Sequence, residues 1–202
     1  MSAILYLEGG ATGADSKELQ IRCREGFRKL LERCGYAGKM PRLRACGSRD
    51  STFGVFKTGH VEKIANDYVA MWIDSEDVVS DPENTWAHLM SRDGWDKPLG
   101  ATDDQVLLMT TCMETLVVAD RKTLASYYDH HLQVTALPPL AALETRSRQD
   151  VQNALFHSTR NCGNAYAKGE RSFGILAKLS PDVLGEFLPS FARTRRILKE
   201  RL

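Results

Sequence analysis

Three acidic residues in this chain follow short apolar runs. Asp74 and Glu76 come after residues 68–73, and Glu8 comes directly after residues 3–7. In extended backbone, side chains two positions apart point to the same side of the strand, so Asp74 and Glu76 would face the same way. If the two apolar runs form neighbouring parallel strands, the carboxylates of Glu8, Asp74 and Glu76 converge in one small volume.

Carboxylates this close together favour the binding of a divalent cation. Like charges repel one another and draw protons back on unless a cation neutralises them. Mg²⁺ or Mn²⁺ suits such a site, because Mg²⁺ prefers a few carboxylates plus water and leaves room for substrate phosphates. The ion would activate a water molecule and stabilise charge on phosphoryl oxygens. The alternative interpretation is that Glu76 and Asp77 are solvated loop acids and that Asp74 caps the next helix.

The elements that would position these acids alternate between strand and helix. Apolar runs of strand length cover residues 3–7, 41–46, 68–73 and 115–119, and helical patterns cover residues 19–34, 53–64 and 102–113. The first helix is expected to start within residues 15–18, which have the spacing of a capping box. The alternation predicts a parallel α/β sheet, and sites in such sheets lie at the carboxyl ends of the strands. Asp120, directly after the fourth predicted strand, would be a further acid at that edge.

The pattern changes to helices after residue 121. Helices are predicted over residues 121–128, 149–159, 173–178 and 183–201. Pro181 and Pro189 mark breaks in this region, because proline interrupts a helix. We interpret residues 1–122 as the α/β core and residues 123–202 as a helical extension packed on that core.

Composition and charge exclude several classes of protein. The 202 residues carry five scattered cysteines, with no C-x-x-C pair, which argues against a disulfide scaffold or a zinc knuckle. No signal peptide is predicted, and no apolar run approaches the ~20 residues that cross a bilayer. We therefore expect a cytoplasmic protein with no membrane segment. The net charge is +5 over residues 1–61, −10 over residues 62–120 and +6 over residues 121–202, a distribution that suits a cation site within a surface that meets polyanions.

Short motifs along nearly the whole chain resemble a known family. Residues 5–9, a strand ending in Glu-Gly, and residues 74–76 resemble the acidic motifs of the Toprim domain, which topoisomerases, primases and the overcoming-lysogenization-defect nucleases share. The longer set of motifs is similar to a Toprim-like bacterial family known only as domain of unknown function 4276. That set comprises Arg44–Arg49, Trp86–Leu89, Arg92–Trp95, Ala101–Gln105, Met113–Thr115, Ala119–Arg121, Tyr166–Gly169 and Ser172–Phe173.

The resemblance implies a Toprim-type, Rossmann-like fold and roles for single residues. Glu8 matches the acid that serves as metal ligand or general base, and Asp74 and Glu76 match the metal-binding D-x-D pair. This chain has Glu in the second position with Asp77 beside it, so either Glu76 or Asp77 could be the second ligand. Later acids would support a second metal, and a lysine would lie near the scissile phosphate; the matching residues are Glu114, Asp120 and Lys168. The resemblance also implies an ATPase partner of the ABC or AAA type, in loci suspected of phage defence.

Other residues are candidates for phosphate contacts. Gly9 and Gly10 follow the first strand in a glycine-rich loop whose backbone amides could touch a substrate phosphate, although the loop is neither a P-loop nor a G-x-G-x-x-G motif. Arg44 and Arg49 flank the end of the second predicted strand, and arginine pairs bidentately with phosphate. Basic residues of the last predicted helix, among them Arg193, Arg195 and Arg196, form a candidate surface for nucleic acid.

Taken together, the residues and the resemblance predict a Mg²⁺- or Mn²⁺-dependent nuclease that hydrolyses phosphodiester bonds in DNA or RNA. It would be the effector subunit of an ATPase-associated antiviral defence system. One alternative is a non-catalytic, metal-binding subunit that docks onto an ATPase. A phosphatase or nucleotide hydrolase is a third possibility, and a closed pocket in place of an open basic groove would favour it.

Overall fold

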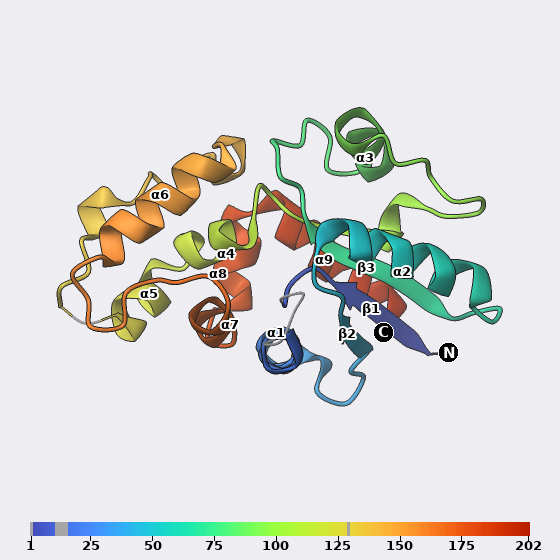
Figure 1. Cartoon of the computed structure of the whole chain (residues 1–202), viewed down its shortest axis with the longest axis horizontal. Coiled ribbons are helices and arrows are strands. Elements are labelled where there is room, and N and C mark those ends of the chain that lie inside the picture. The colour runs from blue at the N-terminus through green and yellow to red at the C-terminus, as the bar shows by residue number, and fades with distance from the viewer. Residues whose placement is uncertain (1, 11–15, 129) are drawn as a thin grey trace.

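Four parallel strands form the centre of the computed structural model, which describes residues 2–10, 16–128 and 130–202 (Figure 1). The order in the sheet is β2-β1-β3-β4, and every neighbouring pair is parallel. The strands are β1 (Ala3–Leu7), β2 (Arg42–Ala45), β3 (Tyr68–Asp74) and β4 (Val106–Met109). The predicted parallel α/β fold is therefore confirmed at the level of a four-stranded sheet flanked by helices. The predicted helix cap at Asp15 and most of the glycine-rich loop lie outside the described residues.

Helices cover both faces of the sheet. On one face, α1 (Ser16–Leu31) and α9 (Pro189–Arg201) pack against the strands, with the rings of Phe27 and Phe191 beside Trp72. On the other face, α2 (Arg49–Glu62) and α3 (Thr85–Asp93) cover a second apolar cluster. A sheet covered on both faces needs apolar side chains on both, which is why every residue of β3 is buried.

The order of elements after β3 differs from the prediction. Residues 102–113 were expected to be a helix and residues 115–119 a strand, but β4 lies at Val106–Met109 and a helix, α4, spans Met113–Ala119. Short apolar runs do not distinguish a buried strand from a buried helix. Both segments are buried almost throughout, so neither has a polar face. Without one, the spacing of polar and apolar residues does not distinguish a helix from a strand. Helix α3 was not predicted at all.

The remaining helices gather beyond the carboxyl ends of the strands (Figure 1). They are α5 (Arg121–Tyr127), α6 (Arg148–Thr159), α7 (Glu170–Leu176) and α8 (Pro181–Phe187). Helix α9 then returns to the sheet and packs against β4. The predicted break at Pro189 is confirmed: two helices meet at Leu188, because Pro189 lacks the N–H that a continuous helix needs. Among the described residues, no helix combines the length and the apolar character needed to span a membrane.

Gly26 lets α1 and α7 approach each other closely. A Cβ atom at this position would lie 2.8 Å from the backbone oxygen of Phe173. We expect Gly26→Ala to lower the free energy of unfolding by about 2 kcal/mol in urea titrations, because overpacking outweighs the gain of about 1 kcal/mol in helix propensity. Gly54→Ala in α2 is the control, since a Cβ there meets nothing within 4 Å, and it should be neutral or stabilising. Equal stability of the two variants would contradict this account of the helix contact.

Candidate metal centre

The candidate site lies between β1 and β3, at the point where the order of the strands in the sheet reverses direction. Strands β1 and β3 are neighbours, but β1 leads to β2 on one side and β3 leads to β4 on the other. Such a switch point leaves a crevice at the carboxyl ends of the two strands, which is where open α/β sheets bind ligands. Glu8 follows β1, and Asp74 is the last residue of β3.

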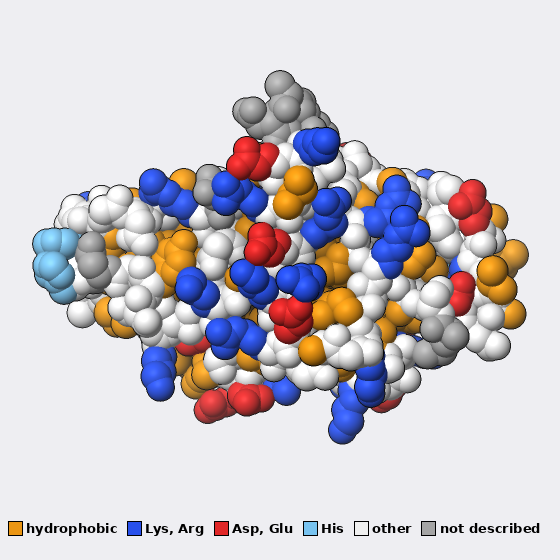
Figure 2. Space-filling model, turned by 90° about the horizontal axis from the view of Figure 1, so that it is seen from below, with side chains coloured by type: hydrophobic (Ala, Val, Ile, Leu, Met, Phe, Trp, Pro, Cys, Tyr) orange, Lys and Arg blue, Asp and Glu red, His pale blue; other side chains and the backbone are white. Residues whose placement is uncertain are grey.

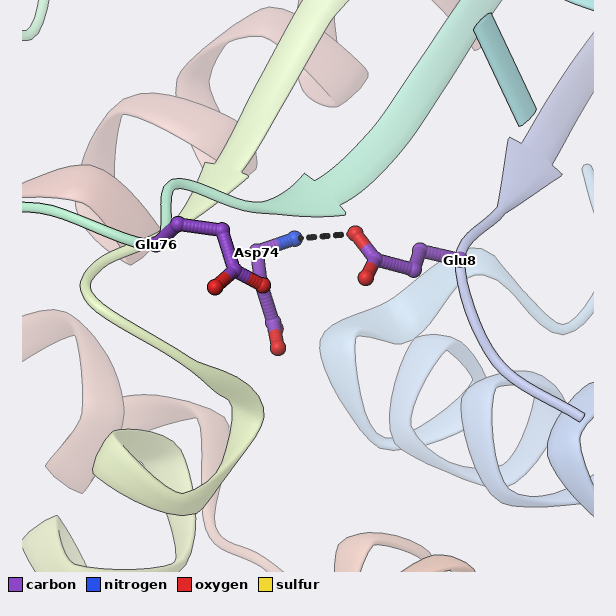
Figure 3. A group of neighbouring side chains, drawn as sticks. All are labelled: Glu8, Asp74 and Glu76. Atoms are coloured by element: carbon purple, nitrogen blue, oxygen red, sulfur yellow. Dashed lines mark hydrogen bonds between the residues drawn. The ribbon is translucent and has the colours of Figure 1, made fainter. Parts of the chain in front are cut away.

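The carboxylates of Glu8, Asp74 and Glu76 meet at this crevice (Figure 3). One oxygen from each lies within 4.8 Å of the other two. The backbone orients two of them: Asp74 N–H donates to Glu8 Oε2 at 3.0 Å, and Met113 N–H donates to Asp74 Oδ1 at 2.8 Å. Glu8 Oε1 and Asp74 Oδ2 accept no hydrogen bond from a described residue. The donor set, three carboxylates with oxygens to spare, fits a hard divalent cation such as Mg²⁺ or Mn²⁺.

Glu76 reaches the group through a turn instead of an extended strand. Its φ of +68° lies in the left-handed region, which side chains other than glycine seldom adopt. Two backbone hydrogen bonds support the turn, from Ser75 N–H to Met109 O at 3.0 Å and from Glu76 N–H to Thr111 O at 2.9 Å. Asp77 points elsewhere: its side chain is 70% exposed and accepts a hydrogen bond from Arg92 Nε at 3.0 Å. Of the two alternatives for the second ligand, the structure places Glu76 in the group and Asp77 outside it.

Three arginines surround the acids. Arg148, the first residue of α6, pairs with Glu76 and lies 3.9 Å from Asp74 Oδ2. Arg92 lies 3.7 Å from Glu76 Oε2, and Arg49 donates to the backbone oxygen of Asp74. The negative charge of the group is therefore partly balanced within the chain. Arg148 was not predicted to be a site residue, because it is distant from the acids in sequence and follows no predicted strand.

Burial dominates the acid–base properties of the group. It raises the pKa of Asp74 well above its ordinary value of 3.8, and the nearby carboxylates of Glu8 and Glu114 raise that pKa further. Burial also raises the pKa of Glu8, although the hydrogen bond from Asp74 and the charges of Arg49, Arg148 and Arg92 act in the opposite direction. Close-set buried carboxyl groups that resist ionisation are expected where a cation normally stabilises the charge.

A cleft of about 360 Å³ opens beside the acids and contains several of the predicted substrate-binding residues. Gly9, Gly10 and Lys168 line it, together with Glu8 and Asp74. Lys168 is half exposed, so its ammonium group is available to a ligand in the cleft.

Glu114 also lines this cleft, but it is buried and held by neutral donors. It accepts hydrogen bonds from Tyr166 Oη at 2.9 Å and Gln152 Nε2 at 3.3 Å, and Lys168 Nζ lies 3.8 Å away. Tyr166 and Gln152 were not singled out from the sequence as site residues. Glu114 is outside the group of three acids that could hold an ion, and its second-metal role stays a prediction.

The prediction that Asp120 lies at a strand end is wrong. Because residues 115–119 form helix α4, Asp120 instead caps α5: it accepts hydrogen bonds from Thr123 N–H at 2.9 Å and Ser180 N–H at 2.8 Å. It is buried and is not part of the acidic group. Asp120 therefore joins α5 to the start of α8.

The arginines proposed for phosphate contact lie in different settings. Arg49 forms an ion pair with Asp93, with 2.6 Å between Nη2 and Oδ2, and lies over the ring of Trp95. These contacts hold Arg49 beside Asp74, where it donates to the backbone oxygen. Arg44 lies over the ring of Tyr6 and does not line the cleft. Arg193 is 6% exposed and donates to the backbone oxygens of Val106 and Asp103.

The neighbours of Arg193 on α9 also have partners within the chain. Arg195 pairs with Asp182 at 3.0 Å and Arg196 with Glu83 at 2.8 Å. These contacts join α9 to α8 and to the segment before α3. Arg193, Arg195 and Arg196 therefore have structural roles, and nucleic-acid binding by this helix stays a prediction.

Comparisons with known proteins do not supply a relative. No protein-family model matches the chain, and no significant match was found among curated proteins or solved structures. The resemblance to the Toprim-like family stays a prediction, and the function has to be argued from the geometry of the site.

Proposed function

We propose that this protein is a Toprim-type hydrolase that uses Mg²⁺ or Mn²⁺ to cleave phosphodiester bonds in DNA or RNA. The observation that carries the proposal is the convergence of Glu8, Asp74 and Glu76 at the switch point of a parallel sheet, beside an open cleft. Phosphoryl transfer needs little covalent chemistry from the protein, and catalysis comes from positioning and charge. A bound divalent ion would activate water and neutralise the phosphate.

The residues of the chain would supply binding and orientation. The backbone N–H groups of Asp74 and Met113 hold the carboxylates of Glu8 and Asp74 in place, so the ligand geometry is formed before any substrate arrives. Lys168 lines the same cleft and would contact a phosphate oxygen there. Glu8, whose Oε1 accepts no hydrogen bond from the residues that the structure describes, is the candidate to accept a proton from the attacking water.

The proposal is tested by incubating the protein with single- and double-stranded DNA and RNA, in Mn²⁺, Mg²⁺ or a chelator. Cleavage that requires the ion and disappears in Asp74→Asn supports it. Cleavage that persists equally in the chelator or in the variant contradicts it. The partner that the resemblance implies, an ABC- or AAA-type ATPase, is added in parallel reactions, and absence of product in every reaction also contradicts the proposal.

One observation favours a second, non-catalytic candidate, in which the acids hold the fold together. Arg148, Arg92 and Arg49 already offset much of the negative charge of the acids, as in a purely structural ion-pair network. In that case the acids stabilise the fold, and replacing one of them lowers the melting temperature without affecting any reaction. The two functions therefore predict opposite effects of Asp74→Asn on stability.

Metal binding is expected to release protons and to become tighter as pH rises. The pKa values of Asp74 and Glu8 are raised in the folded protein, so the metal-free fold holds protons that the unfolded chain has lost. The resulting stabilisation is complete below the unfolded pKa values and is lost as pH rises through the folded values. Calorimetry of Mn²⁺ binding in two buffers of different ionisation enthalpy measures the released protons. Binding with no proton release and equal affinity from about pH 5 to about pH 8 would contradict the raised pKa values.

Arg148 is expected to compete with the metal. Its guanidinium contacts Glu76 and lies near Asp74, so a divalent ion at this group must displace it or bind against its charge. We expect Arg148→Gln to tighten Mn²⁺ binding about tenfold at pH 8, a difference of about 1.4 kcal/mol. Arg160→Gln, at the other end of α6, is the control, because Arg160 contacts the ring of His157 instead. Weaker Mn²⁺ binding by Arg148→Gln would show that this arginine supports the metal site.

A further inference from the structure

A groove between α1 and α7 lies next to the cleft beside the acids. It has a volume of about 340 Å³, and its floor is formed by Gly26 and Gly174, with Phe173 between the two helices. Phe173 also lines the cleft, so the groove and the cleft are neighbours along α7. A ligand chain that left the cleft past Phe173 would enter the groove.

Positive charge dominates the walls of the groove. Four cations line it, namely Arg22, Lys29 and Arg33 from α1 and its continuation and Lys178 from the end of α7, and Glu25 is the one acid among the described lining residues. Figure 2 shows the molecule from below, the side on which α1 and α7 lie in Figure 1, and Lys and Arg side chains outnumber acidic ones across it. A polyanion fits this surface by charge.

Two of these cations have no partner within the described part of the chain. Lys29 pairs with Glu25 at 3.0 Å and Arg22 with Glu18 at 2.8 Å. Arg33 and Lys178, by contrast, are exposed and form no ion pair with a described residue. The groove therefore keeps positive charge that a ligand could neutralise.

Three of the cations form a stripe along α1 and the π-helix Glu32–Tyr36 that continues it. Arg22, Lys29 and Arg33 all line the groove, so they lie on the side that faces it. At 1.5 Å rise per residue the stripe is roughly 16 Å long, which spans several phosphates of a strand that rises about 3.4 Å per phosphate. The volume of about 340 Å³ is that of a small-molecule pocket, so the groove takes part of one strand and cannot enclose a duplex.

We infer that the groove between α1 and α7 binds the phosphate backbone of a single nucleic acid strand and guides it to the acids. This inference rests on the proposed function, because the strand it guides is the substrate. The walls carry cations and the floor carries glycines, with Phe173 as the one aromatic side chain. Binding is therefore electrostatic and independent of sequence, and it weakens steeply as salt increases.

The test compares two double variants of equal charge change. Arg33→Gln with Lys178→Gln removes the unpaired groove cations. Lys57→Gln with Lys63→Gln removes two exposed lysines, one in α2 and one directly after it, on the opposite face of the sheet. Binding of a labelled single-stranded 20-nucleotide oligonucleotide is measured by fluorescence anisotropy in the chelator, over a range of salt. The groove variant should bind about tenfold more weakly, and its log Kd against log salt slope should fall by about 1.4, since each phosphate contact on a single strand contributes about 0.7. The α2 variant should match the wild type.

The outcomes separate this inference from the proposed function. Loss of binding in the groove variant supports the groove even where no cleavage is seen. Equal binding by both double variants overturns it, whether or not the protein cleaves nucleic acid. Anionic vesicles are a second probe: if the groove variant loses vesicle binding and keeps oligonucleotide binding, the surface meets a membrane and the inference is wrong. A duplex bound more tightly than the single strand also overturns it.

Discussion

Asp74→Asn is expected to reduce cleavage of nucleic acid at least a hundredfold while leaving the protein folded. Asp74 lies at the centre of the acidic group, where its carboxylate is within reach of both Glu8 and Glu76. Losing a metal ligand should cost more than the tenfold to hundredfold that loss of a supporting residue costs. The amide oxygen of Asn can still accept the hydrogen bond from Met113 N–H, so the local structure is retained.

The same variant should be at least as stable as the wild type when no metal is present. Asp74 is buried and lies beside like charges, which is why its pKa is raised, and removing one of several repelling carboxylates relieves that cost. Melting temperatures in a chelator measure the effect. Asp120→Asn is the matched control: Asp120 is also buried, and its two oxygens accept from Thr123 N–H and Ser180 N–H. An amide group can accept only one of these hydrogen bonds, so this replacement should lower the melting temperature and leave cleavage intact. Full activity of Asp74→Asn at saturating Mn²⁺ would show that the proposed site is wrong.

Glu76→Gln should weaken Mn²⁺ binding at least tenfold, and Asp77→Asn should change it less than about threefold. Glu76 contributes an oxygen to the acidic group, whereas Asp77 is mostly exposed and paired with Arg92. Gln keeps the shape of the side chain and can still accept from Arg148, so the loss reports charge. Calorimetric titration of the two variants under identical conditions gives both values. A larger loss for Asp77→Asn would move the second ligand to the loop and overturn this assignment.

The sheet could be predicted from the sequence as far as β3, and the later elements could not. Residues 3–7 and 68–73 combine strand length with an acid at the end and turn signals beyond, so their type and direction followed from general rules. Residues 106–109 and 115–119 are likewise apolar and buried almost throughout, but no glycine or proline lies between them to mark where one element ends and the next begins. Periodicity carries no information where every side chain is apolar, and the assignments of strand and helix were exchanged there.

The candidate site was predictable where it depends on strand ends and unpredictable where it depends on tertiary packing. Glu8 and Asp74 converge because parallel neighbours end at one edge of the sheet. Asp120 was misplaced because its strand does not exist. Arg148 reaches the acids from α6, 72 residues beyond its partner Glu76. A contact across that distance depends on how the helical extension folds back, which no local pattern reveals.

Growing crystals in saturating Mn²⁺ and recording anomalous scattering near the manganese absorption edge tests the central claim most directly. The account predicts an anomalous peak between the carboxylates of Glu8, Asp74 and Glu76, with Arg148 moved away from Glu76. The peak should be absent from crystals of Asp74→Asn grown in the same way. A wild-type structure at saturating Mn²⁺ that shows no peak at these three carboxylates, with Arg148 still paired to Glu76, would contradict the account and assign the group to a structural ion-pair network.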